Sequence, residues 1–151
     1  MSRRQTLFME NTEIPAERTA GQIQDLLGRG GAKAVVIGYE GGTIDSVAFQ
    51  LEAPGGKGGT IQFKLPCRWR AVYKLIYGRD PRAYAEHDRD VQKARRVAWR
   101  QVFRWVEAQL AMTRTGMTRL EEVFLPYMTE PGGQTLFEVM QDKGFMLEYK
   151  R

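Results

Sequence analysis

Five cations recur at helical spacing within residues 89–104. They are separated by four, three, four and four residues and therefore share one side of a helix: Arg89, Lys93, Arg96, Arg100 and Arg104. A ridge of this length could meet several phosphates in succession and release counterions at each contact. The spacing predicts a surface for a nucleic-acid backbone, although a solvated helix face without any ligand has the same pattern.

Two aromatic residues, Trp99 and Phe103, lie on the border between this basic side and the apolar side of the same helix. Aromatic rings beside cations are what single-stranded nucleic-acid binders use to stack on bases. The pair therefore favours single-stranded DNA as the ligand, bound with little sequence specificity. The alternative is that both rings pack beneath a neighbouring helix, which is the commoner fate of such aromatics.

A second segment, CRWRAVYKLIYG at residues 67–78, combines the same residue types. The cations Arg68, Arg70 and Lys74 project among aromatic residues. Tyr73 lies near them, where its ring could stack on a base or its hydroxyl could donate a hydrogen bond. We expect these four residues to extend the nucleic-acid surface and Trp69 to belong to the core.

Arg95 falls on the apolar side of the long helix. A guanidinium there needs a carboxylate, a backbone carbonyl or a bound anion, because an unpaired buried charge is very costly. An ion pair with an acid elsewhere in the chain is the favoured partner.

Catalytic motifs are not recognisable in the sequence. GGKGGT lacks the Ser or Thr that follows Lys in a phosphate-binding loop, and GRGGAK lacks the last glycine of a dinucleotide fingerprint. Cys67 and His87 are the single cysteine and histidine, which argues against a disulfide or a thiolate zinc site. We expect a buried Cys67, a surface His87, and neither enzyme activity nor a metal or cofactor. A nuclease site built from converging carboxylates stays open.

Charge is distributed unevenly along the 151 residues. The net charge is +5, and residues 64–104 hold 12 Lys or Arg against 4 acids. Such a basic block favours a polyanionic partner. The chain shows neither an apolar run of membrane-spanning length nor the pattern of a signal peptide. We therefore expect a cytoplasmic protein with no membrane association.

Period-two alternation marks residues 33–65 as a sheet. The alternating apolar positions are Val35, Ile37, Tyr39, Val47, Phe49, Leu51, Ile61, Phe63 and Leu65. The glycine-rich separators EGG and PGGKGG are typical of turns. This pattern predicts a three-stranded antiparallel meander. The preceding TLFMENT is expected to form a further short strand.

Helices are predicted on both sides of the meander. One covers residues 15–29, where the apolar stripe ends at Gly30, and others cover residues 67–78, 89–115 and 134–144. Thr118 and Glu121 have the spacing of a capping box. Trp105 is central on the apolar stripe of the long helix, so we expect it to be buried. Residues 1–151 thus predict one α+β domain with one N-terminal helix, a three-stranded meander and a helical C-terminal half.

Four stretches carry a family resemblance: NTEIPAERTAGQIQDLLGRGGAK, FKLPCRWRAVYKLI, ARRVAWRQVFRWVEAQLAMTRTGM and LEEVFLPYM. In these the chain resembles a family of short uncharacterised phage and prophage proteins, over most of its length. The resemblance implies a small phage accessory protein, from a replication or recombination module or one that modulates a host system. It implies no catalytic residues.

Two functions compete at this point. The first is a phage-type accessory protein that binds nucleic acid through the basic long helix. The alternative is a protein-binding modulator of a host or phage enzyme, whose basic face meets an acidic surface and which has no nucleic-acid role. The sequence leaves open the choice between DNA and RNA, the identity of any protein partner and the oligomeric state.

Overall fold

A four-stranded antiparallel sheet in the order β1-β2-β3-β4 forms one layer of the molecule. The computed structural model describes residues 4–56, 58–82 and 88–146. Its strands are β1 (Ala34–Glu40), β2 (Thr43–Glu52), β3 (Thr60–Leu65) and β4 (Met128–Thr129). The expected α+β class is confirmed, but the expected three strands are one too few. The strand that sequence analysis missed has two residues, too few to show any alternation.

The first three strands form where the alternating pattern placed them. Side chains at alternate positions of β2 and β3 point into the core, including Phe49 and Phe63, whose stacked rings lie 5.0 Å apart. The intervening positions, such as Gln62 and Lys64, are exposed on the other face. β4 returns to the edge of the sheet by pairing Met128 with Phe63.

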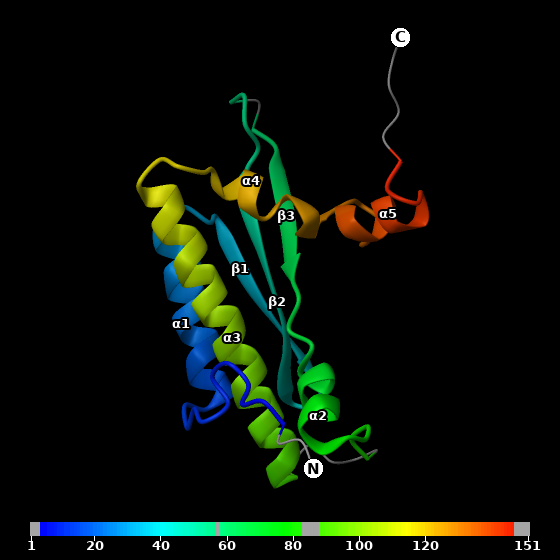
Figure 1. Cartoon of the computed structure of the whole chain (residues 1–151). Coiled ribbons are helices and arrows are strands. Elements are labelled where there is room, and N and C mark those ends of the chain that lie inside the picture. The colour runs from blue at the N-terminus through cyan, green and yellow to red at the C-terminus, as the bar shows by residue number, and fades with distance from the viewer. Residues whose placement is uncertain (1–3, 57, 83–87, 147–151) are drawn as a thin grey trace.

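Two helices, α1 (Ala16–Arg29) and α3 (Arg89–Arg114), lie side by side against the sheet (Figure 1). A shorter helix, α2 (Trp69–Tyr77), packs beside the beginning of α3 and ends at Gly78, whose φ of 71° is readily adopted only by glycine. After α3 come α4 (Leu120–Val123), the 3₁₀ turn η1 (Leu125–Tyr127) and α5 (Leu136–Asp142). The helices predicted at 15–29, 67–78, 89–115 and 134–144 are therefore confirmed within two residues at each end.

Three local expectations were wrong. TLFMENT is not a strand, because residues 7–12 form consecutive turns in which Met9 has a φ of 64°. The helix after Gly116 is capped one residue later than expected, since the Glu122 carboxylate accepts a hydrogen bond from the Arg119 amide at 3.2 Å. Trp105 is only partly buried and packs edge-on against Phe124, with ring centroids 5.1 Å apart.

No helix in the described part of the chain is long and apolar enough to cross a membrane.

Candidate nucleic-acid interface

The basic ridge predicted on α3 is partly buried. Arg100 has 8% of its surface exposed, its guanidinium lies 4.1 Å from the centre of the Phe103 ring, and its Nη1 donates to Gln22 Oε1 at 2.6 Å. Burial, together with the charge of Arg104, lowers the pKa of Arg100. The expectation that Arg100 faces solvent was wrong, because α1 packs along this side of α3.

The aromatic residues predicted to stack on bases belong to the core. Trp99 is fully buried and Phe103 is 7% exposed, so neither ring offers a free face to a base. Tyr73 is also fully buried and packs against Tyr77, with ring centroids 4.7 Å apart. The assignments of Trp99 and Phe103 were wrong because α1 and α2 both pack on α3 and together cover more than the one apolar stripe that its sequence shows. The assignment of Tyr73 was wrong because this residue lies on the buried side of α2, which packs on α3.

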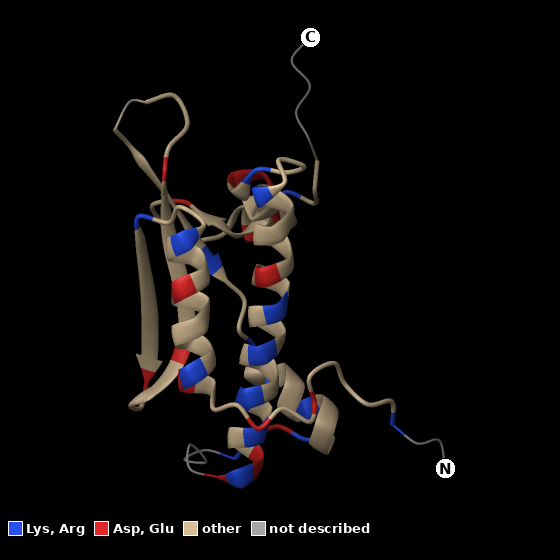
Figure 2. Ribbon diagram, turned by 90° about the vertical axis from the view of Figure 1, so that its left-hand side faces the viewer, with Lys and Arg blue, Asp and Glu red and all other residues tan. Residues whose placement is uncertain are grey.

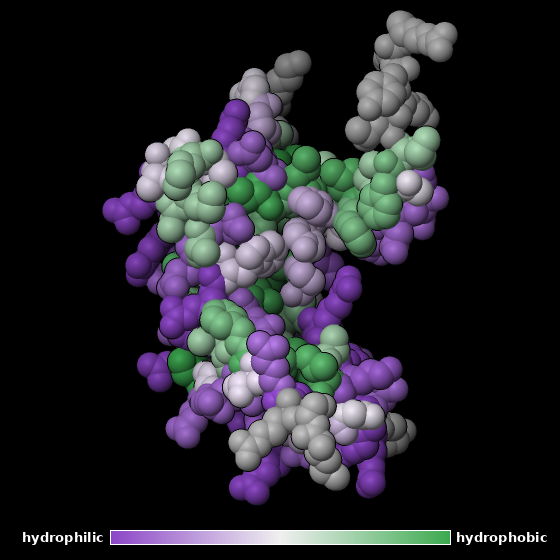
Figure 3. Space-filling model, viewed as in Figure 1, coloured by the Kyte–Doolittle hydropathy of each residue, from purple (hydrophilic) through white to green (hydrophobic). Residues whose placement is uncertain are grey.

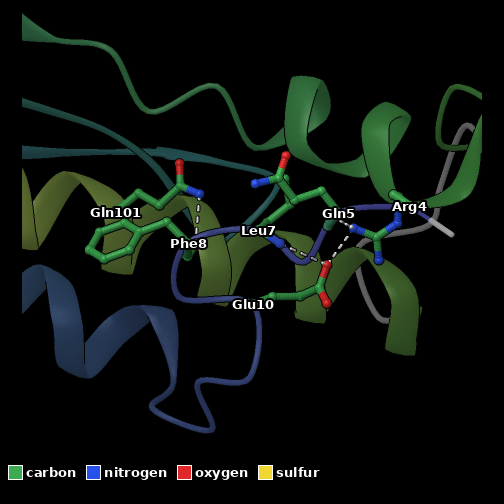
Figure 4. A network of polar contacts seen from close by, with 6 residues as sticks. All are labelled: Arg4, Gln5, Leu7, Phe8, Glu10 and Gln101. Carbon is green, nitrogen blue, oxygen red and sulfur yellow. Dashed lines mark hydrogen bonds and ion pairs between the residues drawn. The ribbon is translucent and has the colours of Figure 1, made fainter.

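Residues 4–14 lie across the solvent side of α3 (Figure 4). The Phe8 carbonyl accepts a hydrogen bond from Gln101 Nε2 at 2.9 Å. The carboxylate of Glu10 accepts one from Arg4 Nη1 at 2.5 Å, and this bond is the main reason that the pKa of Glu10 is lowered, with Lys93 adding a smaller electrostatic effect. This segment therefore brings the Glu10 carboxylate close to the predicted ridge. The sequence of residues 4–14 has no regular pattern from which this position could have been predicted.

The remaining ridge cations differ in accessibility. Arg89 is exposed, whereas Lys93 and Arg96 are half-buried. Arg104 is exposed but forms an ion pair of 2.9 Å with Glu107. The predicted ridge is therefore interrupted at Arg100. Within the described residues, Arg89 is its one exposed cation that forms no ion pair with a carboxylate.

Arg95 is 2% exposed, as its place on the apolar side predicted. Its Nη1 donates to the Ile44 carbonyl at 3.2 Å, and its guanidinium lies 4.6 Å from the centre of the Trp69 ring. A backbone carbonyl was one of the three partners that the sequence allowed. These contacts tie α3 to β2 and α2, so Arg95 holds the fold together.

The cations of α2 are exposed as expected. Arg68, Arg70 and Lys74 lie on its solvent side, and the helix contains no acid. Arg70 and Lys74 are four residues apart, a like-charge spacing that costs a helix a few tenths of a kcal/mol, about 0.2–0.5. Arg70 has one carboxylate at 3.6 Å, that of Glu40, and both side chains are more than half exposed, so the pair is weak.

Further exposed cations flank α2 along the chain, and the guanidinium of one of them, Arg79, lies 5.4 Å from the centre of the Tyr73 ring on that helix. We name the set the α2 cationic surface: Lys64, Arg68, Arg70, Lys74, Arg79, Arg82 and Arg89. Sequence analysis did not assign Lys64, Arg79 or Arg82 to the site, because they lie outside the helical pattern. Figure 2 shows that the blue segments of α3 also gather in the half of that helix that lies beside α2.

A cleft of about 590 Å³ separates the beginning of α2 from α5. Figure 3 shows the molecule hollowed between these two parts. Charged and aromatic side chains from both walls line it, among them Lys64, Arg68, Arg70, Tyr127, Phe137 and Glu138. We call it the α2–α5 cleft.

Cys67 lies at this cleft but is buried, as expected. Burial raises the pKa of its thiol to about 12, with the charge of Asp45 adding to the effect. The thiol is therefore protonated at neutral pH and is not a nucleophile there. The other residue considered for nucleophilic chemistry, His87, lies outside the described residues.

The described residues contain no group of three or more His, Cys, Asp or Glu side chains placed to hold a metal ion. Comparison of the chain with protein-family models, with curated proteins and with solved structures found no match. The resemblance to phage proteins stays an expectation drawn from the sequence.

Proposed function

We propose that this protein binds nucleic acid through the α2 cationic surface and follows the phosphate backbone with little sequence preference. The observation that carries the proposal is a group of seven exposed cations around a helix that contains no acid. Phosphate contacts by Lys and Arg supply sequence-independent affinity by releasing counterions. We propose further that it does so as an accessory protein of phage type in the cytoplasm of the host cell.

The acids around this surface offset its charge only in part. Residues 64–90 contain seven cations and four acids. One of the acids, Asp90, accepts a hydrogen bond from the Tyr77 hydroxyl, which raises the pKa of Tyr77 in addition to the larger effect of burial. This bond joins α2 to the beginning of α3, so Asp90 has a structural role beside the surface.

The proposal moves the interface from the middle of α3 to α2. Arg89 remains in it, while Lys93, Arg96 and Arg104 flank it and are expected to add less. Trp99, Phe103 and Tyr73 leave it, because their rings are buried.

Fluorescence anisotropy with labelled oligonucleotides tests the proposal. Each phosphate-bound cation contributes about −0.7 to −0.9 to the slope of log K against log salt. The double variant R70A/K74A should therefore bind more weakly and lose about one to two units of slope. The control R29A/R114A removes two exposed cations at the other end of α1 and α3 and should change neither quantity. Absence of binding at low salt, or equal effects of both double variants, would contradict the proposal.

A second candidate is a protein-binding modulator of a host or phage enzyme. It is favoured by the apolar side chains exposed on η1, α5 and the residues that follow: Leu125 at 44%, Phe137 at 44%, Phe145 at 55% and Met146 at 73%. A pull-down from nuclease-treated lysate tests it. A partner that persists after nuclease treatment and is lost with L125E/M146E supports this candidate, and loss of every partner on nuclease treatment opposes it.

A further inference from the structure

We propose that the α2–α5 cleft holds one unpaired nucleotide of a bound strand, with its phosphate on Lys64 and Arg68 and its base against Phe137. This inference rests on the proposed function and adds to it a preference for single strands. The lining of the cleft does not include the residues that the sequence predicted to stack on bases, all of which are buried.

One wall of the cleft is cationic. Lys64 comes from β3, Arg68 immediately precedes α2, and both are exposed. Both also act electrostatically on the carboxyl group of Glu138 in α5, adding to the lowering of its pKa that hydrogen bonds from Thr135 mainly cause. Their charges are therefore felt across the cleft, where a phosphate between the walls would meet them.

The opposite wall presents an aromatic ring. Phe137 lies on α5, lines the cleft and is 44% exposed. Its ring meets that of Phe145 at 5.7 Å between centroids, with the planes tilted by 50°. An exposed phenyl ring facing cations combines the two elements of single-strand binding, a stacking platform and a basic groove.

The acidic residues that line the cleft are compatible with a bound nucleotide. Glu138 Oε1 accepts hydrogen bonds from the Thr135 amide at 3.2 Å and from its hydroxyl at 3.0 Å, which caps α5. Asp45 also lines the cleft. These carboxylates disfavour a second phosphate between the two walls, and they can accept hydrogen bonds from the N–H groups of a base, including the N3–H of thymine. The cleft therefore suits one nucleotide better than a polyphosphate.

The size of the cleft and the position of Phe137 favour an unpaired base over a base in a duplex. Its volume of about 590 Å³ is within the range of small-ligand sites, about 300–1,000 Å³. A base in a duplex is covered on both faces by its neighbours and would have to be unstacked and unpaired to reach Phe137. An unpaired base needs no such step.

The test compares a 15-residue oligothymidine with a duplex of the same length at one salt concentration. Base stacking is worth about 1–3 kcal/mol by alanine substitution, so F137A should weaken single-strand binding roughly 5- to 150-fold and change duplex binding less than about twofold. F137L should lose affinity in the same way, because it keeps an apolar side chain without a ring. F137W should keep it. The control F8A removes another exposed phenylalanine, 61% exposed and attached to α3 through its carbonyl, and should have no effect.

The possible outcomes distinguish failure of the cleft assignment from failure of the proposed function. Unchanged single-strand affinity in F137A, full affinity in F137L, or equal losses on both ligands would overturn the assignment of the cleft and leave backbone binding intact. If the unmodified protein binds neither ligand at low salt, the proposed function fails, and this inference fails with it. Melting temperatures of the variants show that any loss does not come from unfolding.

Discussion

Arg100 on α3 donates a hydrogen bond to Gln22 Oε1 on α1 at 2.6 Å, across 78 positions of the sequence. A residue with the pattern of a phosphate ligand thus joins two helices. Its guanidinium also covers the Phe103 ring. This contact changes the expected effect of substituting Arg100. Loss of a structural arginine lowers the stability of the fold, whereas loss of a ligand-binding arginine lowers the affinity for nucleic acid and leaves stability nearly unchanged.

R100A should destabilise the protein by about 1.5–3 kcal/mol, since a part-buried hydrogen bond from a charged group and the packing on Phe103 are both lost. Urea unfolding measures this. R104A is the matched control: its ion pair with Glu107 is exposed, with 43% and 44% of the two side chains accessible, so its removal should cost less than about 1 kcal/mol. A stable R100A that binds nucleic acid poorly would show that Arg100 is a ligand-binding residue after all.

W99A should destabilise the protein by about 3–5 kcal/mol through the cavity it leaves, because Trp99 is fully buried. The comparison is W105A, in which a partly buried ring that packs against Phe124 and Tyr127 is removed, and which should cost less. The midpoints of urea unfolding for both variants decide the order. If W99A melts like the unmodified protein yet binds single strands more weakly, then its ring is accessible to bases and its placement in the core is wrong.

Much of the fold was predictable because its patterns are local. Alternation over a few residues defines β1 to β3, and the apolar stripe of residues 16–29 defines α1. β4 was not predictable, because its two residues become a strand only when the chain returns to Phe63. The cations of α2 were placed correctly because α2 buries one side only, around Trp69 and Tyr73.

The ridge on α3 was placed incorrectly for a related reason. A helix wheel with one apolar stripe assumes a single packed side, whereas α3 contacts α1 and α2 on different sides. Arg100 and Phe103 are consequently buried at positions that the wheel assigns to solvent or to its border. The α2–α5 cleft was invisible to sequence analysis, since its walls are about 70 positions apart, as Arg68 and Phe137 show.

The thiol of Cys67 should resist modification in the folded protein. Its pKa of about 12, raised from 9.0, keeps it neutral, and the residue is buried. Reaction with a disulfide reagent at pH 8 should therefore be slow and should become fast in urea. Rapid labelling without denaturant would contradict the burial of this side chain.

The raised pKa of Cys67 also makes the free energy of unfolding depend on pH. The unfolded chain loses the thiol proton near pH 9 and the folded chain only near pH 12, so the stabilising effect is complete below pH 9 and is lost as the pH rises toward 12. The free energy of unfolding should fall over this range more steeply in the unmodified protein than in C67A. Parallel curves for the two proteins would show that Cys67 titrates alike in both states.

The N-terminal segment should weaken nucleic-acid binding through Glu10. Its carboxylate is held by Arg4 and interacts electrostatically with Lys93 on α3, so E10Q removes a negative charge beside the flank of the proposed interface. Because the repulsion between this carboxylate and a phosphate is electrostatic and is screened by salt, affinity at low salt should rise about two- to fivefold, and the gain should disappear at high salt. E52Q is the control, since Glu52 is 58% exposed and pairs with Lys33 at 3.8 Å. A gain of equal size in E52Q would mean that net charge alone sets the affinity, whereas a gain confined to E10Q would show that residues 4–14 limit access of the phosphate backbone to α3.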